Sequence, residues 1–482
     1  MQARARSDAL ARYFYDRLSY ESAALLGSES SRHFGHAATT LVFDAGPLAN
    51  PGGGVDFDAI RSAIESRLHL VPAYRRKLRR IPFENHPVLV DDREFSLDYH
   101  VRHTGIAHPG EIAQVQKVVA RLQAQRLDRS RPLWECWVIE GLSGNRFALV
   151  MKQHAVLAES GGDLMQVLLS QDPADEFESA PSFVPRPMPS AVELVRDEVV
   201  RQLRLPQRAL RRLQEFARES DSFSNELRHR AQGVANLLGY TIRQLHETPL
   251  SGEPGPHRRF ETLVIPLADA KLVHEELGGT VHDVLLAAVS GAVGAYFRMR
   301  HMNPAVLDFR AAVPVSLRSG DKNEGVGEWI LDLPIWERDP ARRLEQIHTK
   351  TDELNRESPA LGARTLNSVA KWTSSRTLAQ AVRAISERTP VNVRIANVPG
   401  PQTPVYLRGA KLHEAFGTVP LAKSGGLGIA MFSYDGKLCV GVNADYDRVA
   451  DLDVFTRLLA ESVRELVAAA KRKARPLKVV GR

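Results

Sequence analysis

A single histidine, His154, stands where an apolar run ends and has the chemistry of a general base. The run RFALVMK reads as a buried strand, and Gln153 and His154 follow it directly. An imidazole titrates near neutral pH and can accept the proton of a hydroxyl group as that group becomes a nucleophile. The competing interpretation is structural, because a lone histidine after an apolar strand is often a satisfied core residue. These residues alone leave both interpretations open.

The two cysteines, Cys136 and Cys439, have no spacing that is typical of a metal or redox site. No Cys/His pattern accompanies either residue, so we interpret both as reduced thiols. No other set of potential metal ligands has a recognisable spacing. The sequence therefore predicts neither a metal nor a permanently bound cofactor.

The chain has a net charge of +7 and a pI of about 9.4. Clustered Lys and Arg residues are typical of phosphate binding, but no helix-turn-helix, zinc-finger or RNA-binding motif accompanies them. We therefore predict no nucleic-acid partner. Membrane phospholipid and a polyanionic molecule such as coenzyme A fit the charge equally well.

The sequence contains no segment that predicts secretion or membrane crossing. The N-terminus is basic but lacks an apolar core of signal-peptide length. The longest nearly apolar stretch, Val284–Phe297, is shorter than a membrane span and belongs to a predicted buried helix, Val281–Arg298. We expect a cytoplasmic protein that can contact a membrane but does not cross it.

Three regions differ in composition along the 482 residues, which are enough for two domains. Residues 1–185 and 256–482 alternate strand-like and helical patterns, which indicates an α/β fold, whereas residues 186–255 read as basic amphipathic helices. An acidic, Ser- and Pro-rich stretch, 170–190, marks the first boundary. We interpret the middle region as a solvated connector rather than a membrane-surface helix, because its apolar residues are few and acidic residues are interspersed.

Several local motifs occur together in an order that resembles one protein family. They are LSYESAALLGSES (18–30), VDDREFSLDYHV (90–101), LDRSRPLWE (127–135), AAVPVSLR (311–318), IANVPGPQTPVYLRGAKL (395–412) and GGLGIAMFSYDGKLCVGVNAD (425–445). Each one is similar to a segment of the wax ester synthase/diacylglycerol acyltransferase family. The resemblance extends from about residue 18 to 455 and so covers nearly the whole chain.

This resemblance implies a fold like that of chloramphenicol acetyltransferase. Two similar α/β domains, here 1–185 and 256–482, would form a pseudo-dimer joined by the connector 186–255. Acyl-CoA and the acyl acceptor would enter a tunnel between the domains from opposite sides. The implied reaction moves a fatty acyl group from acyl-CoA to a long-chain alcohol or a diacylglycerol, with peripheral contact to a membrane or lipid-droplet surface.

The family's signature is His-His-x-x-x-Asp-Gly, and the corresponding stretch of this chain is QHAVLAE. His154 keeps the second histidine, whereas Gln153, Ala158 and Glu159 replace the other three defining residues. The resemblance implies that His154 is the general base and that Gln153 supplies at most a supporting hydrogen bond. The aspartate lost at Ala158 is structural in the family and pairs with an arginine, so Glu159 or Asp163 are candidates to replace it.

A second departure lies at the start of a predicted helix, where the family has Asn-Asp and this chain has His282 and Asp283. The alignment suggests that His282 faces the same cavity as His154. A histidine at a helix start, beside a partly capping Asp283, explains the pair equally well. Four further residues are candidates to line the tunnel and also have structural interpretations in core packing or turns: Pro132, Trp134, Asn397 and Ser433.

Three functional hypotheses follow from these motifs. The first is an active O-acyltransferase in which His154 is the base and free coenzyme A is the leaving group. The second is a weakly active or inactive family member that binds lipid or a partner protein, and the third is transfer to an unusual alcohol or amine. We favour the first, because acid–base catalysis needs one imidazole and tolerates variation around it. The first hypothesis requires that His154 lies at the bottom of an open tunnel.

Overall fold

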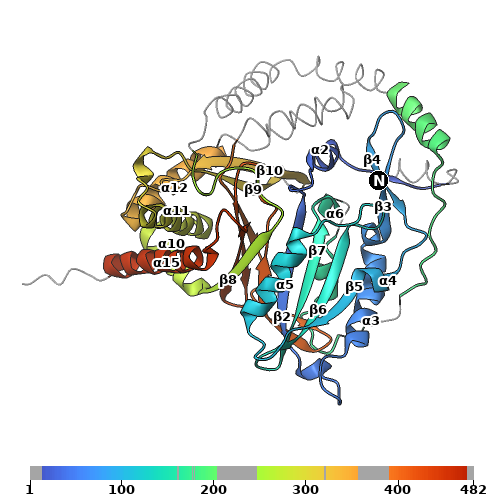
Figure 1. The fold of residues 1–482 in the computed structure, drawn as a ribbon, viewed down its shortest axis with the longest axis horizontal. Helices are drawn as coiled ribbons and strands as arrows, with labels where there is room; N and C mark the ends of the chain where they lie inside the picture. The colour runs from blue at the N-terminus through green and yellow to red at the C-terminus, as the bar shows by residue number, and fades with distance from the viewer. Residues whose placement is uncertain are drawn as a thin grey trace, which may run out of the picture.

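The computed structural model describes residues 13–159, 162–175, 177, 180–203, 247–319, 322–356 and 390–474. These residues form a mixed α/β protein with two six-stranded sheets and a small three-stranded sheet. In Figure 1 the two large sheets lie beside each other, each with its own set of helices. The predicted α/β architecture of two sheet-containing halves is confirmed. Most of the predicted connector, 204–246, lies outside the described residues.

The N-terminal sheet has the strand order β12-β13-β2-β7-β6-β5. Four of these strands come from the N-terminal half: β2 (His36–Asp44), β5 (Val101–Gly105), β6 (Trp134–Leu142) and β7 (Arg146–His154). Strand β7 is buried along most of its length because α3 (Phe57–Arg67) contributes to the apolar cluster on one face and α5 (Ile112–Ala124) to the cluster on the other. A strand buried on both faces reads as a continuous apolar run, so RFALVMK predicts it correctly.

Shorter elements complete the N-terminal half. A three-stranded sheet consists of β1 (Asp16–Arg17), β4 (Pro87–Asp91) and β3 (Arg76–Arg80). The short α-helices are α2 (Tyr20–Ser28), α4 (Leu97–His100), α6 (Val156–Glu159) and α7 (Leu164–Leu168), with 3-10 turns at Gly46–Leu48, Leu68–Leu70 and Pro72–Arg75. A further helix, 191–203, begins the predicted connector.

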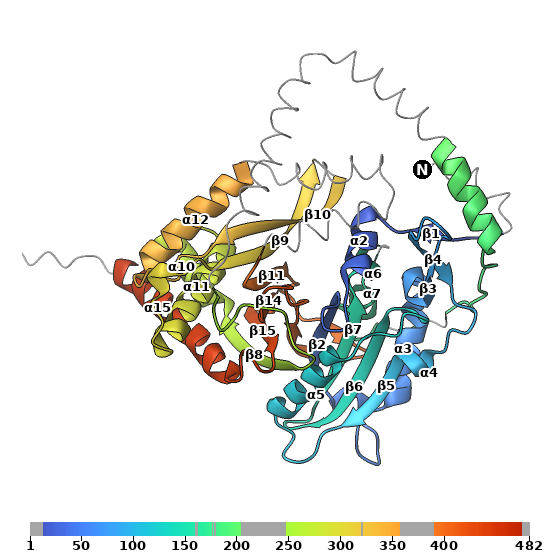
Figure 2. The same cartoon turned by 45° about the horizontal axis from the view of Figure 1, so that its top comes forward.

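The C-terminal sheet has the strand order β10-β9-β11-β14-β15-β8. Its strands are β8 (Arg258–Pro266), β9 (Arg310–Ser319), β10 (Lys322–Asp332), β11 (Val393–Pro399), β14 (Leu427–Tyr434) and β15 (Lys437–Asp445). Strand β11 runs parallel to both β9 and β14, whereas the other pairs are antiparallel. Figure 2 shows β9 and β10 as a long hairpin that extends past the rest of this sheet.

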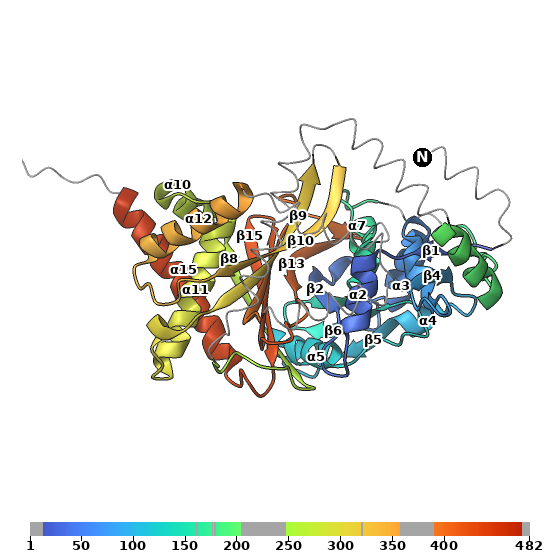
Figure 3. The ribbon, with the colours of Figure 1, turned by 90° about the horizontal axis from the view of Figure 1, so that it is seen from above.

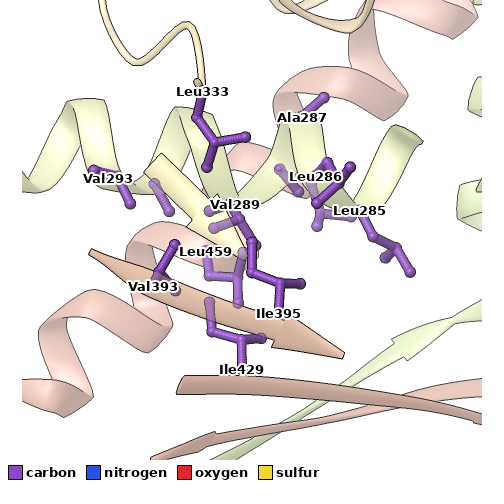
Figure 4. Packing of buried hydrophobic residues seen from close by; sticks show 14 of the residues in the cluster. Leu285, Leu286, Ala287, Val289, Val293, Leu333, Val393, Ile395, Ile429 and Leu459 are labelled. Atoms are coloured by element: carbon purple, nitrogen blue, oxygen red, sulfur yellow. The ribbon is translucent and has the colours of Figure 1, made fainter. Parts of the chain in front are cut away.

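Among the described residues, four helices form the helical layer of the C-terminal half: α10 (Leu267–Leu277), α11 (Val281–Met299), α12 (Pro340–Arg356) and α15 (Leu452–Ala474), with a 3-10 turn at Pro304–Val306. Helix α11 is buried at nearly every position from Asp283 to Phe297, as expected for a helix that is apolar on all sides. Figure 4 shows its Leu285, Val289 and Val293 beside side chains of β11 and β14. No described helix is by itself long and apolar enough to span a membrane, although α10 and α11, bent by 99°, meet that criterion as a pair.

Two strands from the C-terminal half join the N-terminal sheet. Strand β13 (Ala410–Gly417) pairs with β2, and β12 (Tyr406–Leu407) pairs with β13 at the edge. Just after β13, the Thr418 N–H donates to Ala38 O and the Ala38 N–H donates to Thr418 Oγ1, each at 2.8 Å. Figure 3 shows β13 between β2 and the C-terminal strands. The N-terminal sheet therefore contains strands from both sides of the predicted boundaries at 185 and 256.

Candidate active site

The backbone at the end of β7 is held by two neighbouring segments. The His154 N–H donates to Leu133 O at 3.0 Å, and the Ala155 N–H donates to Gly35 O at 2.9 Å. Helix α6 begins one residue later, at Val156, so the chain leaves the sheet immediately after His154. The imidazole therefore projects from a fixed strand end, and only 1% of its surface is exposed.

Glu29, the residue that follows α2, is the direct partner of His154. His154 Nε2 lies 2.7 Å from Glu29 Oε1, and both side chains are 1% exposed. The carboxylate also accepts the Gly35 N–H at 2.5 Å and a hydrogen bond from the Arg129 guanidinium. Burial alone would raise the pKa of Glu29, but the hydrogen bonds from His154, Gly35 and Arg129 outweigh it and lower the pKa to about 2. Glu29 is therefore an anion at neutral pH.

These contacts fix the tautomer of the His154 ring. An ionised carboxylate can only accept, so the hydrogen atom is on Nε2. The other ring nitrogen, Nδ1, lies 3.2 Å from the Val156 backbone nitrogen and accepts its N–H. The imidazole is thus held in one orientation by a carboxylate on one side and a backbone donor on the other.

A second imidazole, His36, lies directly across the strand pair from His154. The two residues are partners in the β2/β7 register, and their ring centroids are 5.4 Å apart in an edge-to-face arrangement. Burial lowers the pKa of His36 to about 2, with Lys152 and His154 adding to the effect. Its Nδ1 is buried and has no hydrogen-bond partner among the residues that the structure describes. His36 is therefore a neutral ring with unused hydrogen-bonding capacity.

Glu29, His36 and His154 bring three potential metal-ligand atoms within 4.8 Å of one another. A metal at His154 Nε2 would require the hydrogen on Nδ1, where it would face the Val156 N–H instead of an acceptor. The Arg129 guanidinium already occupies the Glu29 carboxylate. The arrangement therefore fits a hydrogen-bonded carboxylate–imidazole pair better than a cation site.

A small cavity lies beside His36 where the two halves of the chain meet. It has a volume of about 10 Å³, which is enough for one water molecule. The N-terminal half contributes His33, His36 and Gln123 to its lining, and the C-terminal half contributes Arg258 and Asn443. An open tunnel that reaches His154 remains a prediction, since the ring is buried in this structure.

Gln153 lies on the opposite face of β7 from His154, because successive side chains of a strand alternate. Its Oε1 accepts a hydrogen bond from the Tyr74 hydroxyl, which in turn accepts the Leu164 N–H at 3.3 Å. Gln153 thus supports Tyr74 and the start of α7 rather than the imidazole of His154.

The residues predicted to replace the family's aspartate were expected to pair with an arginine, and the structure gives them different surroundings. Ala158 is exposed on α6, and the side chain of Glu159 lies outside the described residues. Asp163 is the N-cap of α7, where it accepts the Met165 N–H at 3.0 Å. Burial raises the pKa of Asp163, against the lowering effect of the Met165 and Tyr74 hydrogen bonds. Its described partners are therefore a backbone N–H and a tyrosine, not an arginine.

His282, Asp283 and Asn397 are brought together in the C-terminal half. Asp283 forms a capping box with Thr280 at the start of α11 and also accepts a 2.7 Å hydrogen bond from the Thr351 hydroxyl. His282 Nδ1 lies 3.4 Å from Asn397 Nδ2. All three line a cavity of about 360 Å³. The described lining of this cavity does not include His154, so His282 and His154 do not share it.

The other candidates have structural contacts. Trp134 is fully buried, stacks on His100 at 4.6 Å and donates from Nε1 to Tyr74 O at 2.7 Å, and Pro132 beside it is also buried. Ser433 Oγ accepts the Gly400 N–H at 3.2 Å and so holds the turn that follows β11.

Glu29 and His36 are the two residues of this site that motif reasoning does not select. Glu29 lies 125 positions before His154, in a polar SES stretch that gives no sign of burial. His36 begins the strand HAATTLVFD, and a histidine at the end of an apolar strand is the same kind of signal that His154 gives. The pairing of β2 with β7 brings His36 and His154 together, and Glu29 joins them because α2 ends beside the end of β7.

Comparison with known proteins agrees with this architecture. Residues 18–285 match the wax ester synthase/diacylglycerol acyltransferase catalytic domain, and residues 325–467 match the C-terminal domain of the same family. A Mycobacterium tuberculosis protein named as a probable diacylglycerol O-acyltransferase is 29% identical over 459 residues, covering 93% of this chain and 95% of that protein.

Solved structures with the same fold come from two groups. The wax ester synthase/diacylglycerol acyltransferase of Marinobacter aquaeolei superposes with a TM-score of 0.65 at 22% identity, covering 94% of this chain and 100% of that one. The first condensation domain of the calcium-dependent antibiotic synthetase has a TM-score of 0.55 at 15% identity, covering 97% and 99%. Because the two family matches together span both halves of the molecule, this chain belongs to the wax ester synthase/diacylglycerol acyltransferase family.

Proposed function

We propose that this protein is an O-acyltransferase that moves a fatty acyl group from acyl-CoA to a long-chain alcohol or a diacylglycerol. The observation that carries the proposal is the family match in both halves of the chain. Acyl-CoA is a co-substrate in this proposal, and the chemistry requires only side chains and the two substrates.

His154 and Glu29 would supply the acid–base chemistry. The acceptor hydroxyl oxygen attacks the thioester carbonyl carbon, a carbon–oxygen bond forms and the carbon–sulfur bond breaks. His154 takes the hydroxyl proton and returns it to the sulfur of coenzyme A. The Glu29 carboxylate on Nε2 stabilises the imidazolium that forms between these two events, as a carboxylate does in a catalytic triad.

In this arrangement the proton arrives at Nδ1, because Nε2 already carries a hydrogen. The Val156 N–H, which now occupies Nδ1 at 3.2 Å, therefore has to give way. Val156 is the first residue of the four-residue helix α6. A shift of this short helix would open the ring to the acceptor, and we expect substrate binding to produce it.

A second candidate function follows from the same contacts. Both nitrogens of His154 are engaged and the ring is 1% exposed, which is also how a purely structural histidine is held. On that basis the protein would be a weakly active or inactive family member that binds lipid. Transfer to an unusual alcohol or amine would use the same ring and differ only in the acceptor.

Although the sequence favours a solvated connector over a membrane-surface helix for this region, the exposed side chains of the helix at 191–203 support peripheral contact with a lipid surface. Val192, Val199 and Leu203 are 77%, 50% and 70% exposed, and their spacing places them on one face of the helix. Arg196 lies on the same face, four residues after Val192. An apolar stripe with a basic residue suits the surface of an anionic membrane or a lipid droplet. The proposed location is the cytoplasm, at such a surface.

The test is release of coenzyme A from palmitoyl-CoA by the purified full chain, with hexadecanol or dioleoylglycerol as acceptor. We expect acceptor-dependent release in the wild type and a loss of about 100- to 10,000-fold in His154→Ala, the usual effect of removing a general base. The exposed His69 supplies the matched control, since His69→Ala should retain full activity.

His154→Gln serves as a second variant that keeps side-chain volume if the alanine variant unfolds. Equal coenzyme A release by wild type, His154→Ala and His154→Gln would overturn the catalytic assignment. Absence of release with every alcohol, diacylglycerol and amine tried would favour the lipid-binding alternative.

A further inference from the structure

A second carboxylate–imidazole pair lies in the C-terminal half, apart from His154 and Glu29. His348, on α12, places its Nδ1 3.0 Å from Oδ2 of Asp283, near the start of α11. Both residues line the cavity of about 360 Å³, a volume within the range of small-molecule pockets. The pair therefore lies beside a space that a substrate can occupy.

The carboxylate of Asp283 is buried and held in one orientation. Its Oδ2 accepts the Thr280 N–H at 2.8 Å and the Thr280 hydroxyl at 2.9 Å, and its Oδ1 accepts the Thr351 hydroxyl at 2.7 Å. Burial raises the pKa of Asp283, but the hydrogen bonds from the two threonines and His348 outweigh this effect and lower the pKa below its usual value. Asp283 is therefore an anion at neutral pH.

This anion fixes the tautomer of His348. An ionised carboxylate can only accept, so the ring hydrogen is on Nδ1 and Nε2 carries a lone pair. Among the residues that the structure describes, Nε2 has no hydrogen-bond partner, and the side chain is 44% exposed. A carboxylate on Nδ1 together with a free Nε2 is the arrangement of the base in a Ser-His-Asp triad.

The two carboxylate–imidazole pairs differ in what their second ring nitrogen can do. At His154 that nitrogen accepts the Val156 N–H, and the ring is 1% exposed. At His348 the second nitrogen has no partner in the described ranges, and the residue lines a cavity. His348 can therefore take a proton from a bound molecule without a rearrangement of the backbone.

The lining of the cavity indicates a neutral substrate. Its described part contains the carboxylates of Asp283 and Asp352 and no lysine or arginine, so no such cation would pair with an anionic group. Pro314 and Trp329 add apolar surface, and Asn355 adds an amide that can donate to a carbonyl oxygen. A small uncharged ester, which has one carbonyl group and an apolar part, fits this lining.

We propose that Asp283 and His348 form a second acid–base centre that hydrolyses small neutral esters. His348 Nε2 takes a proton from water, the water oxygen attacks the ester carbonyl carbon, and the bond from this carbon to the leaving oxygen breaks. The imidazolium returns its proton to the leaving oxygen, which gives a carboxylic acid and an alcohol. The choice of an acyl carbonyl as the electrophile rests on the proposed function, whereas the base does not depend on His154.

The test is hydrolysis of 4-nitrophenyl acetate by the purified full chain without acyl-CoA, measured as release of 4-nitrophenolate. We expect the wild type to exceed the buffer rate and His348→Gln to lose about 100-fold of this activity, the lower end of the range for a general base. This variant should fold, because His348 lies half-exposed on a helix surface.

His69 supplies the matched control. Its Nδ1 lies 2.8 Å from Ser66 O, which is an uncharged acceptor, and the residue does not line the cavity. His69→Gln therefore makes the same chemical change at an exposed imidazole without a carboxylate partner. It should keep the wild-type rate of ester hydrolysis.

Two further measurements separate the roles of the pair. Asp283 is a positioning residue, so Asp283→Asn should lower kcat and leave KM unchanged, because the amide no longer stabilises the imidazolium. The wild-type rate should also be lower in D₂O, because a proton moves during the attack of water. An unchanged rate in D₂O would indicate direct attack by Nε2 on the ester and would overturn the general-base role.

Equal rates of hydrolysis by wild type and His348→Gln would overturn the proposal, as would an equal loss in His69→Gln. Absence of hydrolysis by the wild type would overturn it as well. Failure of coenzyme A release in the His154 experiment would leave ester hydrolysis by His348 intact, so the two proposals fail separately.

Discussion

The two polar clusters of this protein differ in how much of their hydrogen-bonding capacity the chain itself satisfies. Around His154, the Glu29 carboxylate accepts from a ring nitrogen, a backbone N–H and a guanidinium, and the second ring nitrogen accepts from Val156. Around His282, an imidazole N–H and an indole N–H have no partner in the described part of the chain. The His154–Glu29 pair is fully hydrogen-bonded, although the neighbouring His36 keeps an unpaired Nδ1 within the described residues, and the second cluster lines a cavity of about 360 Å³.

This difference separates a buried ion pair with all its partners from buried neutral donors that lack them. A buried ionised side chain needs several partners to remain charged, which makes its site rigid and sensitive to the loss of any partner. Unpaired neutral donors instead destabilise the folded protein by the cost of an unmade hydrogen bond. Substitutions in the two clusters should therefore have effects of very different size.

The largest effect on stability is expected for Glu29→Ala. The substitution leaves Arg129 and the His154 N–H without their buried acceptor, and breaking a buried ion pair costs about 3–5 kcal/mol. Urea unfolding at pH 7 measures the change. Glu29→Gln, which keeps one acceptor oxygen, should lie between the alanine variant and the wild type. A loss below about 1 kcal/mol in Glu29→Ala would contradict a fully hydrogen-bonded pair.

Acid should remove the same stabilisation in the wild type. The pKa of Glu29 is lowered from 4.5 to about 2, so its contribution is fully present above pH 4.5 and is lost as the pH falls towards 2. A shift of this size corresponds to stabilisation on the order of 3 kcal/mol. Urea midpoints between pH 5 and pH 2 should fall more steeply in the wild type than in Glu29→Gln. Parallel curves for the two proteins would show that this carboxylate is not responsible.

Asp283→Asn should have a moderate effect of about 1–2 kcal/mol, because a carboxylate that accepts from Thr280 and His348 at Oδ2 and from Thr351 at Oδ1 is replaced by an amide that also donates. Thermal unfolding measures it. A destabilisation as large as that of Glu29→Ala would mean that the two clusters do not differ in the way described.

The smallest effect is expected for His36→Leu. His36 Nδ1 has no partner within the described ranges, so an apolar side chain of similar volume should change the free energy of unfolding by less than about 1 kcal/mol. Coenzyme A release from the same preparation provides a second measurement. Loss of acyl transfer with unchanged stability would move His36 from the surroundings of the site into the catalytic machinery.

Much of the frame is predictable from the sequence because it depends on local patterns. RFALVMK predicts β7, and the apolar stretch around Val284–Phe297 predicts the buried helix α11. The position of His154 at the end of its strand follows from the same pattern. These features need only the periodicity of a strand or a helix and the length of an apolar run.

The partners within the site are not predictable in this way. Glu29 gives no local sign of burial, and its contact with His154 exists only because α2 ends beside the end of β7. Gln153 was expected to support His154, but strand alternation directs it to Tyr74. Family alignment selects His282, Asp283 and Asn397. Their separation from His154 arises because they line a cavity in the C-terminal half, whereas His154 ends a strand of the N-terminal sheet.

The placement of β13 in the N-terminal sheet has a consequence for synthesis of the protein on the ribosome. Strand β2 is complete after 44 residues, but its pairing partner β13 ends at residue 417. One edge of β2 therefore stays unpaired until β13 has been translated. An unpaired edge can form hydrogen bonds with other chains. We expect truncated nascent chains that end before residue 410 to need chaperone protection, because neither half can complete the N-terminal sheet alone.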